Sequence, residues 1–526
     1  MTRTAKLLLP PLFLLQILFF GFISTHRFLE GDEGFYLLAS RLVLMHRKPY
    51  VDFFYTQAPL LPYVYALWMK CTTLSWISAK LFSALLTTLL GMLLYGHVCR
   101  LTRSWMAGLS AVVLFVPCTL VFAWFPVVKT YSLSELFLFS GYLIISRVSA
   151  ASPRWMTPTA ALMLGLSVAT RSYLVLLIPL FLWWILHNSD ARFGLNSFLG
   201  FLGGFTVGII PCLYLLLCSP DAFFFNNLGY HALRADAGLI GMWQEKFVVI
   251  LVSFLGELQG NGIQNSILVV VSLALIFSIR KRKYVPRFAF QVAVAIGFIS
   301  LLPTPVFPQY FCLCIPFLIV STVCVANDLI AELKSRQERL VAALSCVALL
   351  SIYVAASVPD LRKYLITGDG INAVEAAPDK GDWRLERVLE VSRAVELIAG
   401  PGETVASFSP GDIFQTRATP LPGLESDFGL PISTKLTSQQ RARYHILSPV
   451  EVEANFAAHR PRVVLLRNQI LVSLTAEGDR KWDTGENFRR FLRAQGYTLT
   501  RSIGGISIYV CCSNPDTSGT GASPSS

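Results

Sequence analysis

Three acidic residues stand within four positions, directly after the first long apolar segment of the chain. They are Glu30, Asp32 and Glu33, and acidic residues are otherwise rare in the first 358 positions. An ionised carboxylate beside a lipid bilayer is costly to maintain, so its presence indicates a functional role. Burial near lipid also raises the pKa of a carboxyl group toward that of a useful general base. Asp32 and Glu33 are therefore candidate catalytic residues; the alternative is that the cluster caps a loop helix and faces water.

Cations expected at the same membrane face could hold an anionic leaving group. Lys129 and Arg171 stand between apolar segments, and Arg234 lies in a polar loop. Arg binds phosphate through two parallel hydrogen bonds. A carboxylate base with such cations would suffice to move a sugar from a phosphate to a hydroxyl. The alternative for each cation is to reach lipid headgroups, as Lys and Arg near helix ends often do.

Three further polar residues could bind a substrate, namely Asp52, Gln309 and Tyr310. For Gln309 and Tyr310 the alternative is a proline-shaped helix start with Tyr at the membrane interface. No His or Cys stands at a metal-ligating spacing, and neither G-x-G-x-x-G nor a P-loop occurs. We therefore expect no metal site and no cofactor, although the sequence leaves a divalent cation open.

The composition is that of a polytopic membrane protein. Of 526 residues, 54% are hydrophobic and only 14% are charged, whereas about a quarter are charged in soluble domains. The net charge of +12 could suggest nucleic acid. Most Lys and Arg lie between apolar segments, however, where they indicate membrane topology, so no nucleic-acid partner is expected.

Eleven apolar segments predict about eleven membrane-spanning helices. A cytoplasmic N-terminus then places the basic clusters between these segments on the cytoplasmic side. Two external loops result, at about 26–57 and 219–263, and a helix is expected at 34–45. The segments are 7–25, 78–98, 105–123, 131–147, 157–170, 172–187, 194–218, 264–279, 287–303, 309–326 and 339–358.

After residue 358 the charged residues become frequent and no apolar run reaches spanning length. The pattern predicts an extracytoplasmic α/β domain at 359–512, followed by a disordered tail at 513–526. Its expected helices are 383–398, 449–458 and 486–495, and its expected strands are 404–409, 462–467 and a pair within 497–511 that turns at Gly504 and Gly505.

Several short motifs together resemble those of the GT-C superfamily of membrane glycosyltransferases, near its bacterial protein O-mannosyltransferase and aminoarabinose-transferase relatives. The matching residues are Gly31-Asp32-Glu33-Gly34-x-Tyr36, Pro49-Tyr50-x-Asp52-Phe53, Ala58-Pro59-Leu60, Arg171 after an apolar helix, and Gln309-Tyr310 before Pro316. The likeness extends over about residues 1–326, and its specific part is the first loop.

The resemblance implies a GT-C-like transmembrane domain at 1–358 and a polyprenyl-monophosphate sugar donor. It further implies inverting transfer on the outer face, with Asp32 as the base, Glu33 in contact with donor or acceptor, and Tyr36 in the substrate site. The aminoarabinose-transferase branch has a Glu-Lys pair before Pro-Pro, where this chain reads Thr56-Gln57-Ala58-Pro59. That departure leaves the donor phosphate to Arg171 or Lys129.

The leading prediction is therefore a hexosyltransferase of the GT-C type in a bacterial inner or plasma membrane. Its partners would be a lipid-linked donor, a hydroxyl acceptor on a glycan, lipid or protein, and membrane lipids. One alternative is a transporter or flippase, which would place polar residues and broken helices near the bilayer midplane. Another is a membrane-anchored binding protein whose soluble tail does the work.

Overall fold

The computed structural model describes residues 2–149, 152–188, 195–234, 238–254, 261–277, 285–369, 371–375, 377, 379–467 and 485–511. The chain forms two compact units. The first contains residues 1–51 and 55–375, and the second contains residues 52–54 and 376–526. The predicted tail at 513–526 lies outside the described residues.

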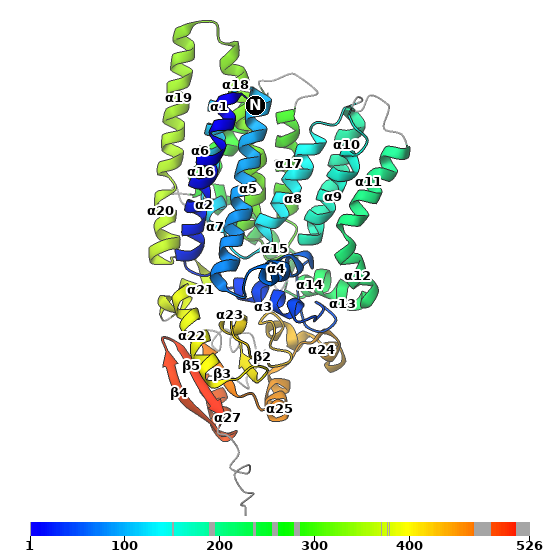
Figure 1. Ribbon diagram of the computed structural model, residues 1–526, viewed down its shortest axis with the longest axis vertical. Helices are drawn as coiled ribbons and strands as arrows, with labels where there is room; N and C mark the ends of the chain where they lie inside the picture. The colour runs from blue at the N-terminus through cyan, green and yellow to red at the C-terminus, as the bar shows by residue number, and fades with distance from the viewer. Residues whose placement is uncertain are drawn as a thin grey trace, which may run out of the picture. The chain divides into compact units, whose positions relative to one another are not determined.

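The first unit is helical (Figure 1). Its elements are α1 (Arg3–Leu7), α2 (Leu9–His26), α3 (Glu33–Leu44), α4 (Leu60–Cys71), α5 (Trp76–Thr102), α6 (Trp105–Phe115), α7 (Thr119–Trp124), α8 (Thr130–Ile145), α9 (Met156–Thr170), η1 (Ser172–Leu177), α10 (Ile178–Asn188), α11 (Leu195–Gly208), α12 (Ile210–Cys218), α13 (Pro220–Phe224), η2 (Phe225–Gly229), α14 (Tyr230–Leu233), α15 (Gly238–Phe254), α16 (Asn261–Phe277), α17 (Val285–Ser300), η3 (Pro308–Cys314), α18 (Ile315–Glu332), α19 (Arg336–Ala355), α20 (Val358–Arg362), η4 (Lys363–Thr367) and α21 (Asn372–Glu375).

Four helical stretches of the described chain are long and apolar enough to cross a membrane. They are Arg3–His26, Trp76–Thr102, Pro308–Glu332 and Arg336–Thr367. The pair α11 and α12, bent by 62°, would make a fifth. The other predicted segments are helical where they are described but shorter. The segment predicted at 105–123 is divided, and Pro117 lies between its two helices, α6 and α7. Eleven crossings are thus not established.

The two predicted external loops contain helices of their own. The helix expected at 34–45 is α3, and α4 packs against it. In α3, every residue from Glu33 to Leu42 is buried. A helix that lies in the membrane interface would expose one face instead. The loop predicted at 219–263 holds α13, η2, α14 and α15.

The helical part continues beyond the predicted limit at residue 358. After α19, the chain stays helical through α20 and the π-helical η4 to Thr367. Tyr364 of η4 packs edge-on against Phe122 and Trp124 of α7. Because of these contacts, the first unit extends to residue 375.

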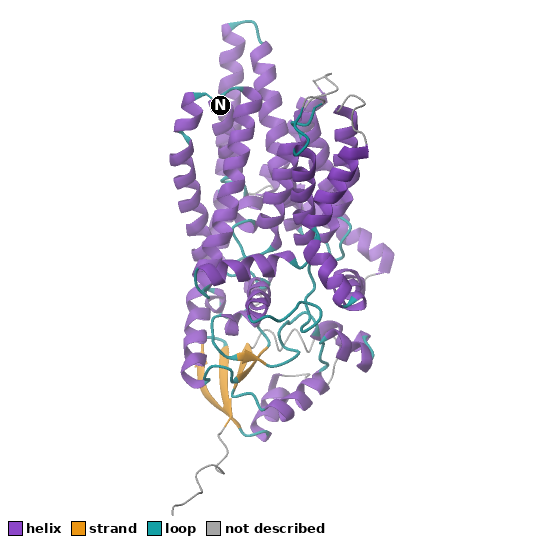
Figure 2. Ribbon diagram, turned by 45° about the vertical axis from the view of Figure 1, so that its right-hand side comes forward, coloured by secondary structure: helices purple, strands orange, loops and turns teal. Residues whose placement is uncertain are grey.

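The second unit is built on a five-stranded sheet with the order β2-β1-β3-β5-β4 (Figure 2). β1 pairs in parallel with β2 and β3, while β5 runs antiparallel to β3 and β4. Its predicted helices and strands are all present. The elements are η5 (Lys380–Trp383), α22 (Leu385–Ile398), β1 (Thr404–Ser407), α23 (Pro410–Phe414), β2 (Thr419–Pro420), η6 (Leu430–Lys435), α24 (Ser438–Tyr444), α25 (Pro449–His459), β3 (Val463–Arg467), α27 (Gly485–Ala494), β4 (Tyr497–Ile503) and β5 (Ile506–Cys511).

Candidate functional site

A buried ion pair fixes the start of α3. The Glu33 carboxylate accepts hydrogen bonds of 3.1 and 2.8 Å from the Lys80 ammonium of α5, and neither side chain is exposed. It also accepts from the backbone N–H groups of Glu30 and Val128. Burial alone would raise the pKa of Glu33, but the Lys80 ammonium and the Arg27 guanidinium outweigh it and hold that pKa below its ordinary value. Glu33 thus ties α3 to α5 and to the segment before α8.

Lys129 joins the other two acids of the cluster. Its ammonium lies 2.8 Å from Oε2 of Glu30 and 2.8 Å from Oδ2 of Asp32. The Lys129 side chain is 4% exposed, whereas that of Asp32 is 36% exposed. Burial opposes the charge on Lys129, but Asp32 and Glu30 outweigh it and raise its pKa well above the ordinary value, so Lys129 is charged. Burial and the charge on Asp32 raise the pKa of Glu30 despite Lys129.

Arg171 follows the last residue of α9 and is surrounded by aromatic rings. Its guanidinium carbon lies 4.4 Å from the ring centre of Tyr131, 4.8 Å from that of Tyr173 and 5.6 Å from that of Tyr310. It donates hydrogen bonds to the Thr130 hydroxyl at 2.6 Å and to the Tyr173 hydroxyl at 2.8 Å. Thr130 is the first residue of α8 and Lys129 precedes it, so one helix start holds both cations near each other.

Two tyrosines connect the predicted residues electrostatically. Burial and the charge on Asp32 raise the pKa of Tyr36, while Lys129 and Arg171 act in the opposite direction. The charges of Arg171, Arg234, Lys129 and Asp32 all act on the Tyr310 hydroxyl. The structure therefore gathers Asp32, Tyr36, Lys129, Arg171, Arg234 and Tyr310 in one place in the first unit.

Three predicted residues differ from this group. For Glu33, predicted to contact donor or acceptor, the structure shows a fully buried carboxylate bound by Lys80 and two backbone N–H groups. Asp52 belongs to the second unit. Gln309 is half-buried in η3, next to Tyr310. Within the described ranges, no three His, Cys, Asp or Glu side chains gather as metal ligands.

Two residues of the site were missed from the sequence. Lys80 lies inside the apolar segment 78–98, and an ionisable residue within such a segment is a signal of function that could have been used. Arg27 follows α2 and is fully buried, with its guanidinium 5.0 Å from the ring centre of Tyr364. No sequence signal indicates that contact, since the two residues lie in distant segments.

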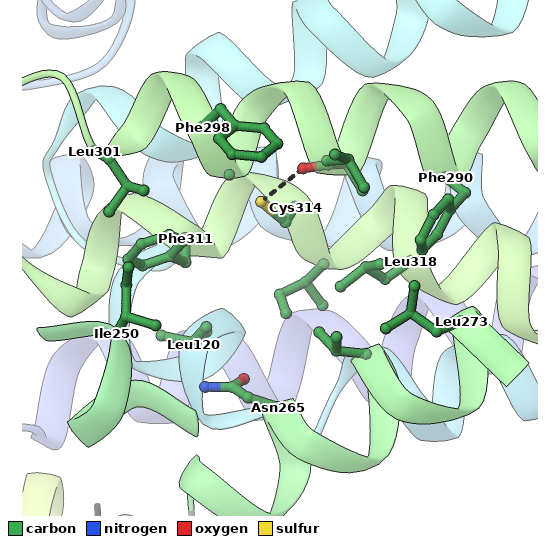
Figure 3. Close-up of a pocket in the computed structure, with 15 residues that line it drawn as sticks. Leu120, Ile250, Asn265, Leu273, Phe290, Phe298, Leu301, Phe311, Cys314 and Leu318 are labelled. Carbon is green, nitrogen blue, oxygen red and sulfur yellow. Dashed lines mark hydrogen bonds between the residues drawn. The ribbon is translucent and has the colours of Figure 1, made fainter. Parts of the chain in front are cut away.

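An apolar cavity of about 280 Å³ lies in the first unit (Figure 3). It is lined by side chains of α15, α16, α17, α18 and η3, and the Asn265 amide is the polar side chain labelled among them. Phe311 lines the cavity, and the preceding residue, Tyr310, lies over Arg171. The element η3 thus connects the cavity to the charged group.

No protein-family model matches the sequence, and no curated protein matches it either. Solved structures match the fold of this chain. The apo crystal structure of ArnT from Cupriavidus metallidurans has a TM-score of 0.62 and 12% identity, over 95% of this chain and 97% of that chain. ArnT bound to undecaprenyl phosphate has a TM-score of 0.62 and 13% identity, over 97% and 98%. The likeness to ArnT confirms the fold that the sequence predicted, over nearly the whole chain.

Proposed function

We propose that this protein is a membrane glycosyltransferase that moves a sugar from a polyprenyl-monophosphate donor to a hydroxyl acceptor. The observation that carries the proposal is the position of Asp32, a partly exposed carboxylate in contact with the buried cation Lys129. Arg171 is a second buried cation close to Lys129, because it donates a hydrogen bond to Thr130, the first residue of α8. The donor class is supported by the shared fold, because one ArnT structure holds undecaprenyl phosphate.

Asp32 is the proposed general base. Its side chain is 36% exposed, so an acceptor hydroxyl can reach it. The carboxylate takes the hydroxyl proton as the acceptor oxygen attacks the anomeric carbon from the side opposite the phosphate. The new glycosidic bond forms as the bond from this carbon to the phosphate oxygen breaks, which inverts the anomeric configuration.

Lys129 and Arg171 are the proposed partners of the leaving phosphate. As the donor bond breaks, negative charge grows on the polyprenyl phosphate, and nearby buried cations stabilise it strongly because little water screens them. Lys129 contacts both Glu30 and Asp32. A donor phosphate would compete for this ammonium, and its success would free an oxygen of Asp32 for proton transfer.

The other predicted residues take supporting parts in this proposal. Tyr36, Arg234, Gln309 and Tyr310 bind the sugar or phosphate. Glu33 becomes a positioning residue, because its bonds to the Val128 N–H and to Lys80 fix the segment that leads into Lys129.

The apolar cavity is the proposed place for the first part of the prenyl chain. Burial of apolar groups stabilises by about 25 cal/mol per Å². The prenyl chain would enter beside Phe311, one residue from Tyr310, so the phosphate would remain close to Arg171.

In the proposed topology, the N-terminus is in the cytoplasm and the second unit is outside, as the basic clusters predict.

A turnover assay tests the proposal. Purified protein receives polyprenyl-phosphate mannose, glucose or aminoarabinose together with an envelope extract as the source of acceptors, and released polyprenyl phosphate is measured. We expect release with a hexose donor that depends on the extract. No release with any donor, combined with solute uptake into vesicles that contain the protein, would instead support a transporter.

A further inference from the structure

Trp124, the last residue of α7, lies close to two cations. The Lys129 ammonium is 5.5 Å from its ring centre, and the Arg27 guanidinium carbon is 5.9 Å from it. A cation over an aromatic face is attracted to it, most strongly where water is excluded. Trp124 therefore links Arg27 to the lysine that is proposed to hold the donor phosphate.

Arg27 is held on several sides. It is fully buried, its Nε donates to the Phe28 carbonyl at 3.1 Å, and its Nη1 donates to the Ala123 carbonyl beside Trp124. Its Nη2 has no hydrogen-bond partner among the described residues. A buried charge with incomplete hydrogen bonding is costly, so the aromatic faces around it must supply part of its stabilisation.

Tyr364 supplies one of these faces from the far end of the chain. Its ring centre lies 5.0 Å from the Arg27 guanidinium carbon, and its carbonyl accepts the Phe28 N–H at 3.1 Å. Gly368 then turns the chain with a φ of +69°, and a Cβ at this position would lie 3.2 Å from the Phe28 ring. The end of the long helix from Arg336 is thus tied to the end of α2.

The contacts also continue toward Arg171. The ring centre of Trp124 lies 6.4 Å from that of Tyr131, and Arg171 lies 4.4 Å over Tyr131. A continuous series of rings and cations therefore runs from Tyr364 through Arg27 and Trp124 to Lys129, and through Tyr131 to Arg171.

We propose that Arg27, Trp124 and Tyr364 are positioning residues for the donor phosphate, which act through Lys129 and Tyr131. The inference rests on the proposed function. It extends the donor site to η4, which lies near the end of the first unit and far from the external loops in the sequence. A purely structural role would change stability and leave donor affinity unchanged.

Tyr364 offers a matched pair of variants. Tyr364→Phe keeps the ring over Arg27, whereas Tyr364→Leu keeps an apolar side chain without a π face. The probe is undecaprenyl phosphate, whose affinity is measured for detergent-purified protein together with the donor KM and kcat. For Tyr364→Leu we expect Kd and KM to rise about 3- to 10-fold while kcat changes less than about twofold. Tyr364→Phe should stay within about twofold of the wild type, as should the control Trp155→Leu, which changes an exposed Trp.

The binding measurement separates the two proposals because it needs no acceptor. A wild type that binds undecaprenyl phosphate without any sugar transfer would contradict the proposed function, and the Tyr364 pair would still test the positioning role. Equal Kd values for Tyr364→Leu and Tyr364→Phe would overturn that role, even if their melting temperatures differ. A wild type that does not bind the lipid would overturn both.

Discussion

The Lys129 ammonium and Asp32 lie in direct contact, with 2.8 Å between Nζ and Oδ2. Glu30 shares the same ammonium at 2.8 Å. The proposed base and the proposed phosphate ligand therefore contact each other directly. A donor phosphate that binds Lys129 would have to displace one of these bonds.

Removal of the Glu30 carboxylate should strengthen the binding of the donor phosphate to Lys129. Glu30→Gln takes away one competitor for Lys129 and one negative charge near the donor, while keeping the size of the side chain. We expect the affinity for undecaprenyl phosphate to rise about threefold or more, since one partly buried ion pair contributes about 1 kcal/mol. Binding titrations test this, with Glu386→Gln, at an exposed glutamate of α22, as control. Weaker binding by Glu30→Gln would contradict the competition.

The buried pair of Glu33 and Lys80 should dominate the stability of the first loop. Lys80→Met leaves the Glu33 carboxylate without its cation, and breaking a buried pair in this way costs about 3–5 kcal/mol. Adding Glu33→Gln removes the unpaired charge while keeping an acceptor for the Val128 N–H. The double variant should therefore melt at a higher temperature than Lys80→Met alone. A double variant that is the less stable of the two would contradict the assignment.

Filling the apolar cavity should affect the lipid part of the donor. A Cβ on Gly297, which lines this cavity, would meet open space. Gly297→Phe should weaken the binding of a long-chain polyprenyl phosphate several-fold and leave a short-chain analogue unaffected. Gly203→Phe, at an exposed glycine of α11 with similar room, is the matched control. Equal losses for long and short chains would argue against this place for the chain.

His231 of α14 predicts a loss of stability in acid. Its Nε2 lies 3.2 Å from the Thr56 carbonyl, and burial, reinforced by Arg234, lowers its pKa to about 4. An unfolded His takes up a proton near pH 6.5, whereas the folded one resists it, so stability is full above pH 6.5 and falls between pH 6.5 and 4. The loss reaches at most about 3 kcal/mol.

His231→Gln keeps a donor for the Thr56 carbonyl and removes the titration. Melting temperatures at pH 7.5 and 4.5 measure the effect in both proteins. The fall in melting temperature from pH 7.5 to pH 4.5 should be smaller in the variant than in the wild type. An equal fall in both proteins would show that His231 does not cause the loss of stability in acid.

The acid cluster, Lys129 and Arg171 could be predicted because acidic residues are rare in the helical part and both cations stand between apolar segments, whereas Lys80 and Arg27 were missed. The sequence could not predict which cation each acid of the cluster contacts. Glu33 and Asp32 are neighbours in sequence, yet one is fully buried by Lys80 and the other reaches the surface. Which of them faces a substrate depends on contacts with α5 and with the segment before α8, and one sequence does not reveal such distant contacts.

The elements of the second unit were easier to predict than the membrane crossings. Glycines at 504 and 505 mark the turn between β4 and β5, and β3 is an apolar run of ordinary strand length. By contrast, α4 is apolar but too short to be recognised as a span, and the contact of Trp124 with Arg27 joins segments that no local pattern relates.

The most direct test of the central claim is the turnover number of Asp32→Asn with the donor that the wild type uses. Asparagine keeps the shape of the side chain but cannot accept the acceptor proton. The account predicts a fall in kcat of at least about 100-fold, without weaker binding of undecaprenyl phosphate, because the substitution also removes a carboxylate that competes for Lys129. The control Asp221→Asn, at an exposed aspartate of α13, should keep normal turnover. Near-normal kcat for Asp32→Asn would contradict the account.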